Sequence, residues 1–250
     1  ATNTSTLDVD AIAAASGRAG DVVGMHFFSP AHVMRLVEIV RGRDTSRATL
    51  ATALAVTRRI GKIGVTVGNC FGFVGNRMLY AYGREKELML LEGATPEQID
   101  KALQDFGMAM GPNAVGDLAG LDIGWQVRRE WSGRPDDPRF YRMSDLLAEL
   151  GRFGQKTGRG FYRYDGPGGE RVPDPEVPDL IRAEAVRLGV AQRSHSPNEI
   201  VTRSILALVN EGARVLEEGI AETPADIDVI WCNGYGFPRQ GGGPMKYADT

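Results

Sequence analysis

Two apolar runs on either side of a short turn are the feature that most restricts what this chain can fold into. Residues 24–40 read GMHFFSPAHVMRLVEIV, with the ionisable side chains of His26 inside the first run and Glu38 inside the second. Short, almost continuous apolar runs bounded by a turn are typical of strands that are buried on both faces. The segment therefore predicts a buried β-hairpin that turns around His32.

The hairpin also predicts that its two ionisable residues meet. If the turn is centred on His32, antiparallel pairing places His26 opposite Glu38, with Cβ atoms about 5 Å apart. A carboxylate at that distance fixes the imidazole tautomer and leaves the other ring nitrogen free to act as a general base. The same spacing also fits a core histidine satisfied by a local carboxylate, or two residues that never meet.

The segments around the hairpin predict an α/β part followed by helices. We expect a helix from Thr6 to Ala15 with Ser5 or Thr6 as its N-cap, a helix over 47–60 and a strand over 63–67. A long helical pattern then covers 73–92, and further helical patterns follow it. The predicted fold class is therefore α/β plus all-α.

An internal repeat lies in the helical part. Residues 76–100 and 202–228 share an early arginine, a helix that ends in Glu-Gly and a restart at Thr-Pro followed by Ile-Asp. Both segments then run through glycines to a Gly-Pro pair, at 111–112 and 243–244. Good helix starts resemble one another, but the shared order favours a duplicated helical unit. Between the copies, the proline-rich stretch 165–178 predicts a linker.

Composition excludes several classes of protein. A net charge of −3 gives no electrostatic reason to expect nucleic acid or a membrane surface as a partner. Cys70 and Cys232 lie far apart, which indicates a reducing compartment and neither a disulfide framework nor a zinc site. No apolar run approaches the roughly 20 residues of a membrane span. Because the chain does not begin with methionine, we expect it to be a piece of a longer protein.

Ser5 and Asn76 are two further candidate site residues. Taken alone, Ser5 is explained as an N-cap, and Asn76, which follows the glycine-rich GNCFGFVG, as an ordinary asparagine at a helix start. In open α/β sheets, however, a helix N-terminus that follows a strand also receives polar or anionic ligands.

Taken together, five stretches of the sequence resemble the L-3-hydroxyacyl-CoA dehydrogenase family, in the family's order and over essentially the full length. They are NTS (3–5), HFFSPAHVMRLVEIV (26–40), GNCFGFVGNRML (68–79), MGP with DLAGLD (110–122) and FGQKTGRGFYRYD (153–165). The duplicated helical part further resembles the multifunctional enzymes of fatty-acid β-oxidation, which place an enoyl-CoA hydratase/isomerase domain ahead of the dehydrogenase.

The resemblance implies NAD-dependent oxidation of L-3-hydroxyacyl-CoA to 3-ketoacyl-CoA, without a metal. It assigns catalytic roles to His26, Glu38, Ser5 and Asn76, and contacts with the NAD cofactor to Asn3, Ser5 and Lys156. In that scheme His26 is the base and Glu38 its partner. Two rival hypotheses are a dehydrogenase that acts on a different hydroxy substrate, and a non-catalytic structural or docking segment of a β-oxidation complex.

The same resemblance implies a domain order. Residues 1–70 correspond to the C-terminal part of a Rossmann-type NAD-binding domain and 71–165 to a first helical domain of the substrate or dimerisation type. Residues 166–196 correspond to a linker with a connecting helix, and 197–250 to a second helical repeat. In single-function relatives the helical domain occurs once and pairs with a second subunit, so we expect the second copy to pack in that subunit's place.

The dinucleotide fingerprint GxGxxG is absent from the sequence. The nearest stretch, GYGFPR at 234–239, has arginine at the third glycine position and follows no clear strand, so we reject it. We expect the fingerprint before Ala1, and expect these 250 residues alone to bind NAD poorly and turn over negligibly.

The expected partners are an acyl-CoA substrate, an upstream hydratase/isomerase domain in the same polypeptide and the thiolase subunit that some family members bind. The expected location is the cytoplasm, or the peroxisome in a eukaryote.

Overall fold

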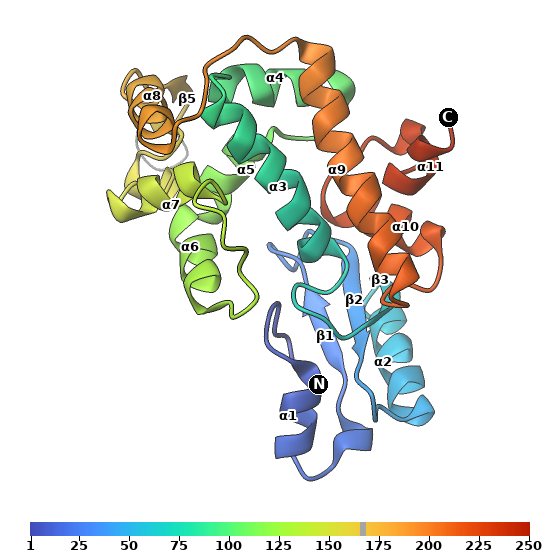
Figure 1. Cartoon of the computed structure of the whole chain (residues 1–250). Coiled ribbons are helices and arrows are strands. Elements are labelled where there is room, and N and C mark those ends of the chain that lie inside the picture. The colour runs from blue at the N-terminus through green and yellow to red at the C-terminus, as the bar shows by residue number, and fades with distance from the viewer. Residues whose placement is uncertain (166–168) are drawn as a thin grey trace. The chain divides into compact units, whose positions relative to one another are not determined.

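The computed structural model describes residues 1–165 and 169–250 (Figure 1). The described chain forms two compact units. Unit 1 comprises Ala1–Ala81 and Leu206–Thr250, and unit 2 comprises Tyr82–Ile205. Two long helices, α3 (Gly75–Leu91) and α9 (Pro197–Glu217), contribute residues to both units.

Unit 1 contains a three-stranded sheet in the order β1 (Gly24–Phe27), β2 (Leu36–Arg41) and β3 (Ile63–Gly68). β1 and β2 are antiparallel, which confirms the predicted hairpin. β2 and β3 are parallel, and α2 (Arg47–Arg59) makes the crossover that a parallel pair requires. At the chain start, Thr2 forms a parallel bridge to β1.

The two faces of this sheet are covered by different helices. Val37 and Ile39 belong to the core cluster that packs against α2. Because successive strand residues point to opposite faces, Glu38 lies on the other side. There α10 (Pro224–Gly234) contacts β2 and β3 and ends against Leu36. The sheet therefore places His26 and Glu38 on the face away from α2.

The first helix is shorter than the sequence pattern predicted. α1 spans Val9–Ala15 with Asp8 as its N-cap, so the expected start at Thr6, capped by Ser5 or Thr6, is wrong. Asn69 accounts for the difference, because its side-chain amide donates to Asp8 (2.6 Å) and its oxygen accepts from the backbone N–H of Val9 (3.3 Å). A contact from the segment after β3 thus helps to fix where the helix begins.

Unit 2 is mostly helical. Its remaining helices are α4 (Pro96–Phe106), α5 (Pro112–Ala119), α6 (Leu121–Glu130), α7 (Arg142–Glu149) and α8 (Val177–Leu188), and β4 (Tyr162–Tyr164) pairs with β5 (Arg171–Pro173). The buried carboxylate of Asp117 joins α5 to β4, accepting bonds from the N–H groups of Phe161 and Tyr162 and from the hydroxyl of Tyr164. Burial raises the pKa of Asp117 to about 6 despite these donors.

The predicted linker contains more regular structure than expected. Within 165–178, β5 pairs antiparallel with β4, and α8 already begins at Val177. The proline at position 178 suits the first turn of a helix, where no intrahelical partner for its nitrogen is needed. Residues 166–168 of the predicted linker lie outside the described residues.

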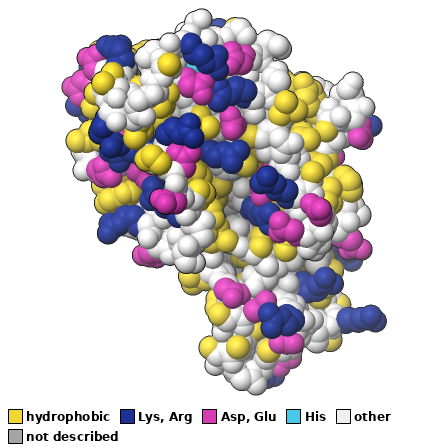
Figure 2. Space-filling view, viewed as in Figure 1, with side chains coloured by type: hydrophobic (Ala, Val, Ile, Leu, Met, Phe, Trp, Pro, Cys, Tyr) yellow, Lys and Arg dark blue, Asp and Glu magenta, His cyan; other side chains and the backbone are white. Residues whose placement is uncertain are grey.

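Charged side chains of both signs are interspersed on the face shown in Figure 2. Lys101 and Asp105 of α4 form an exposed pair 2.8 Å apart. Such pairs each contribute only about 0 to 1 kcal/mol, so the buried contacts decide the fold. No helix within 1–165 or 169–250 combines the length and apolar character that a bilayer crossing requires.

Candidate active site

The central feature of the candidate site is a buried, hydrogen-bonded pair of side chains between β1 and β2. The strand register sets His26 opposite Glu38, and Nδ1 of the imidazole lies 2.8 Å from Oε2 of the carboxylate. The two residues are 6% and 0% exposed, respectively. The prediction that they touch is confirmed.

The second oxygen of Glu38 holds the start of α3. Oε1 accepts bonds from the backbone N–H groups of Val74 (3.2 Å) and Gly75 (2.9 Å). Gly72 and Phe73 both have positive φ, so the chain turns sharply just before the helix. Because a helix N-terminus carries a partial positive charge, it stabilises the ionised carboxylate. Glu38 is therefore fixed at both oxygens and cannot rotate without breaking a bond.

The other imidazole nitrogen remains available. The ring of His26 lies beside Phe28 (4.7 Å between centroids) and Phe73 (5.6 Å), and no described residue forms a hydrogen bond to its Nε2. A neutral imidazole with Nδ1–H held by a carboxylate presents Nε2 as a proton acceptor. The geometry is that of an oriented general base.

Asn76 lies in the first turn of α3, immediately after the amide that Glu38 binds. Its Oδ1 accepts a hydrogen bond from the Tyr235 hydroxyl at 2.8 Å. Tyr235, in the stretch 234–239 that we rejected as a dinucleotide loop, was not predicted as a site residue, because its bond to Asn76 joins segments far apart in the sequence. An aromatic residue between two glycines at the end of a helical pattern was the available signal.

Asn3 and Ser5 lie in the segment before α1. The side-chain oxygen of Asn3 accepts from the backbone N–H of Phe27 (3.0 Å), which anchors this segment beside His26 on β1. Ser5 is partly buried and does not cap α1. The structure thus joins His26 to Glu38 and anchors Asn3 at the next residue of β1, whereas no described contact joins Ser5 to them.

Lys156 belongs to unit 2 and has a partner there. Its ammonium group lies 2.6 Å from the Asp122 carboxylate in the first turn of α6, and its side chain is 47% exposed. An exposed pair of this kind is weak and can exchange partners with a ligand.

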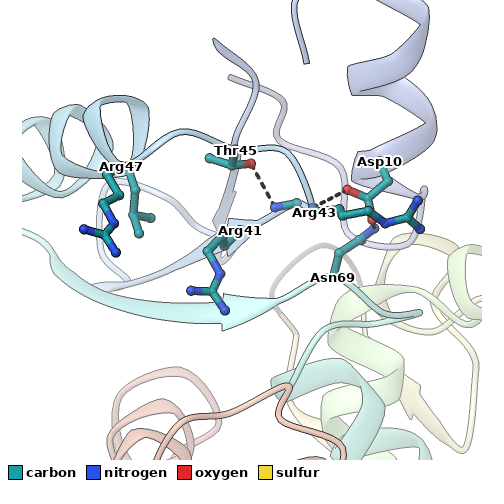
Figure 3. Close-up of a pocket in the computed structure, with 8 residues that line it drawn as sticks. Asp10, Arg41, Arg43, Thr45, Arg47 and Asn69 are labelled. Carbon is teal, nitrogen blue, oxygen red and sulfur yellow. Dashed lines mark hydrogen bonds between the residues drawn. The ribbon is translucent and has the colours of Figure 1, made fainter. Parts of the chain in front are cut away.

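Unit 1 also has a surface hollow of about 460 Å³ away from the His26–Glu38 pair (Figure 3). Three arginines between the end of β2 and the start of α2 contribute to its lining: Arg41, Arg43 and Arg47. Asp10 also lines it and accepts from the backbone N–H of Arg43 (2.7 Å). The lining supplies charge but no oriented base, so we do not assign the reaction to it. Within the described residues, no group of three or more His, Cys, Asp or Glu side chains is arranged to hold a metal ion.

Two family profiles match the chain. Residues 1–70 match the NAD binding domain of 3-hydroxyacyl-CoA dehydrogenase, and residues 72–164 match the C-terminal domain of the same enzyme. The predicted combination of a Rossmann-type NAD-binding part and a helical part is confirmed at this level.

Known proteins cover nearly the whole chain. It is 52% identical to the peroxisomal bifunctional enzyme of Danio rerio over 98% of its length, and 38% identical to the fatty acid oxidation complex subunit alpha of Acinetobacter baylyi over 100%. It spans 36% and 35% of those relatives. Among solved structures, the dehydrogenase part of multifunctional enzyme 1 from C. elegans matches with a TM-score of 0.68 and 36% identity, covering 95% of this chain and 54% of that one.

Proposed function

Because the chain belongs to the 3-hydroxyacyl-CoA dehydrogenase family, we propose that it carries the catalytic residues that oxidise L-3-hydroxyacyl-CoA to 3-ketoacyl-CoA in fatty-acid β-oxidation. The observation that carries this proposal is the buried His26–Glu38 pair, with the carboxylate fixed at both oxygens. Oxidising a secondary alcohol removes a proton from oxygen and a hydride from carbon. The proton needs an oriented base, which this pair supplies.

In the proposed reaction, Nε2 of His26 takes the proton from the C3 hydroxyl as the C3–H bond breaks. Glu38 stays ionised and stabilises the imidazolium that forms, as a buried carboxylate does beside a catalytic histidine. The side-chain N–H groups of Asn76 and the hydroxyl of Ser5 donate to the substrate oxygen while it becomes a carbonyl.

Bound NAD would supply the acceptor for the hydride that leaves C3. We propose that Asn3, Ser5 and Lys156 contact it. Asn3 uses its oxygen to accept from Phe27, which leaves its N–H groups free as donors, and Ser5 offers a hydroxyl. These donors suit the carbonyl oxygen of a carboxamide such as that of nicotinamide, and the Lys156 ammonium suits an anionic group. The residues present therefore fit the cofactor's chemistry.

The decisive experiment measures initial rates of NAD reduction by the full-length protein with a panel of L-3-hydroxyacyl-CoA thioesters and free hydroxy acids. We expect turnover of the thioesters and a loss of about a hundredfold or more in kcat for His26→Gln, because a positioned base contributes on that order. Turnover of free hydroxy acids but not of the thioesters would show that the protein is a dehydrogenase for a different class of substrate. Unchanged rates in His26→Gln would indicate a non-catalytic segment.

We further propose that the helical part is a tandem repeat. Support comes from matched details of local structure. Thr95 and Thr223 each cap a helix with a proline in its first turn and a complete capping box. In both segments, an aspartate of that helix, Asp100 or Asp228, accepts bonds from backbone N–H groups in the first turn of the next helix. That next helix begins at the proline of a Gly-Pro pair.

A reciprocal pair of ion bridges also supports the repeat. Arg77, early in α3, binds Glu218 just after α9 at 2.6 Å, and Arg203, early in α9, binds Glu92 just after α3 at 2.7 Å. Equivalent residues of the two segments thus make equivalent contacts, as a duplicated helical unit predicts. Reversing one bridge tests it, since Arg77→Glu should lower the melting temperature and Arg77→Glu with Glu218→Arg should restore part of the loss. The recovery is partial because Arg77 also binds Glu211 at 2.6 Å. Failure of the double variant to recover would count against this bridge as a specific contact.

The wider context of the chain follows from its relatives. We propose an enoyl-CoA hydratase/isomerase domain in the same polypeptide, because relatives named bifunctional are nearly three times longer than this chain. We also propose the predicted domain limits, a thiolase partner and, in a eukaryotic host, a peroxisomal location. Purifying the native protein and identifying co-purifying activities would test these partners, and hydration of enoyl-CoA by the same polypeptide is the expected result.

A further inference from the structure

We propose that Tyr235 is a positioning residue for the reaction, which orients the Asn76 amide so that its N–H groups face the substrate oxygen. This inference rests on the proposed function, and it gives the last segment of the chain a direct role at the catalytic centre. All the residues involved belong to unit 1.

The hydrogen bond has a defined direction. Oδ1 of Asn76 can only accept, so the Tyr235 hydroxyl donates to it across 2.8 Å. With its oxygen occupied, the amide keeps both N–H donors for another acceptor. Without the tyrosine hydroxyl, the Asn76 amide could rotate by about 180° and point its oxygen at the substrate oxygen. The two oxygens would then repel each other.

The ring of Tyr235 is held in place from several sides. It stacks on Trp231 at 4.6 Å between centroids, and it meets Phe28 edge-on at 5.4 Å. A Cβ atom at Gly75 would lie 2.5 Å from the tyrosine ring and hydroxyl, so only glycine at this position lets the ring reach α3. Phe28 in turn contacts His26, which makes one continuous row of rings from the base to Tyr235.

The hydroxyl also stays protonated. Burial raises the pKa of Tyr235 well above its ordinary value, and the Glu38 carboxylate raises it further. Tyr235 therefore keeps its proton and remains a hydrogen-bond donor near neutral pH. A fixed ring and a permanent donor are what an orienting contact requires.

The test is Tyr235→Phe in the full-length protein, which keeps the ring contacts and removes only the hydroxyl. We expect kcat for L-3-hydroxyacyl-CoA oxidation to fall about tenfold while KM for the thioester changes less than about twofold. Tyr247→Phe, the same change on α11 (Pro244–Ala248), serves as the control and should leave kcat unaltered.

A double-mutant cycle separates orientation from a general structural role. In an Asn76→Ala background, Tyr235→Phe should have no further effect on kcat, because the amide that it orients is absent. A tenfold loss that persists in that background would overturn the inference, as would a wild-type rate in the single variant. Absence of turnover in the wild-type protein would instead overturn the proposed function and this inference with it.

Discussion

Replacing Glu38 by glutamine tests the proposed mechanism most directly. Glutamine keeps an oxygen that can accept from the N–H groups of Val74 and Gly75, so the start of α3 retains its partner. Its amide, however, would present an N–H group to the N–H at Nδ1 of His26. The charge and the acceptor that orient the imidazole are both lost, while the shape of the side chain is preserved.

The magnitude of the effect follows from the geometry. A carboxylate about 4 Å from the imidazolium charge stabilises it by about 4 kcal/mol at an effective dielectric constant of about 20. If about half of the charge has developed in the transition state, the loss is about 2 kcal/mol, or about 30-fold in rate. A wrong imidazole tautomer adds to this loss, and removing the analogous carboxylate of a catalytic triad costs about 10⁴-fold. We therefore expect kcat to fall by between about 30-fold and 1,000-fold.

The assay is steady-state NAD reduction with an L-3-hydroxyacyl-CoA, together with thermal melting of each variant. Glu87→Gln is the matched control. Glu87 is also 0% exposed and also accepts backbone bonds, from Met143 (2.7 Å) and Ser144 (3.2 Å), but its charged partner is Lys86 rather than a histidine. The Glu87→Gln variant should have a lower melting temperature without a comparable loss of kcat. A folded Glu38→Gln variant with kcat within about threefold of wild type would refute the reasoning.

Three further predictions concern the stability contributed by Glu92 and Gly75 and the catalytic role of Asn76. Burial opposes ionisation of Glu92, but hydrogen bonds, first among them the one from Arg203, outweigh the effect of burial and lower the pKa of Glu92 to about 2. The ionised carboxylate therefore stabilises the fold above pH 4.5, and this stabilisation is lost as the pH falls towards 2. The difference in melting temperature between wild type and Glu92→Gln should therefore shrink over that range, and a constant difference would contradict the assignment. Gly75→Ala should destabilise the protein by about 1 to 3 kcal/mol in denaturant titrations, because its Cβ would clash with Tyr235, and an unchanged midpoint would contradict this contact. Asn76→Ala should lower kcat about a hundredfold with an unaltered circular dichroism spectrum, whereas a small change would remove Asn76 from the reaction.

The hairpin and its pair were predictable because they depend on local rules. Antiparallel strands joined by a short turn match residues symmetrically about that turn, so the partner of His26 followed once the turn was centred on His32. The helix caps at Thr95 and Thr223 were visible for the same reason, because a cap is satisfied within a few residues of sequence.

Contacts that join distant segments were not predictable in this way. Ser5, Thr6 and Asp8 are all good N-caps, and Asn69, far along the sequence, supports the choice of Asp8. The bond from Glu38 to the first amides of α3 depends on how the sheet and that helix pack, which no local pattern encodes. Tyr235 was missed for the same reason.

Glu38 connects the catalytic histidine to the N-terminal end of α3, and helix ends are the parts of a helix that unfold most easily. The first turn of a helix frays at a lower free energy than global unfolding requires. Here the N–H groups of Val74, just before α3, and of Gly75, its first residue, are bound by the carboxylate that holds His26. Each fraying event releases one oxygen of Glu38 and lets the imidazole lose its orientation. Heat should therefore inactivate the enzyme below its melting temperature. Hydrogen exchange at the amides of Val74 and Gly75 should speed up over the same temperature range in which activity is lost.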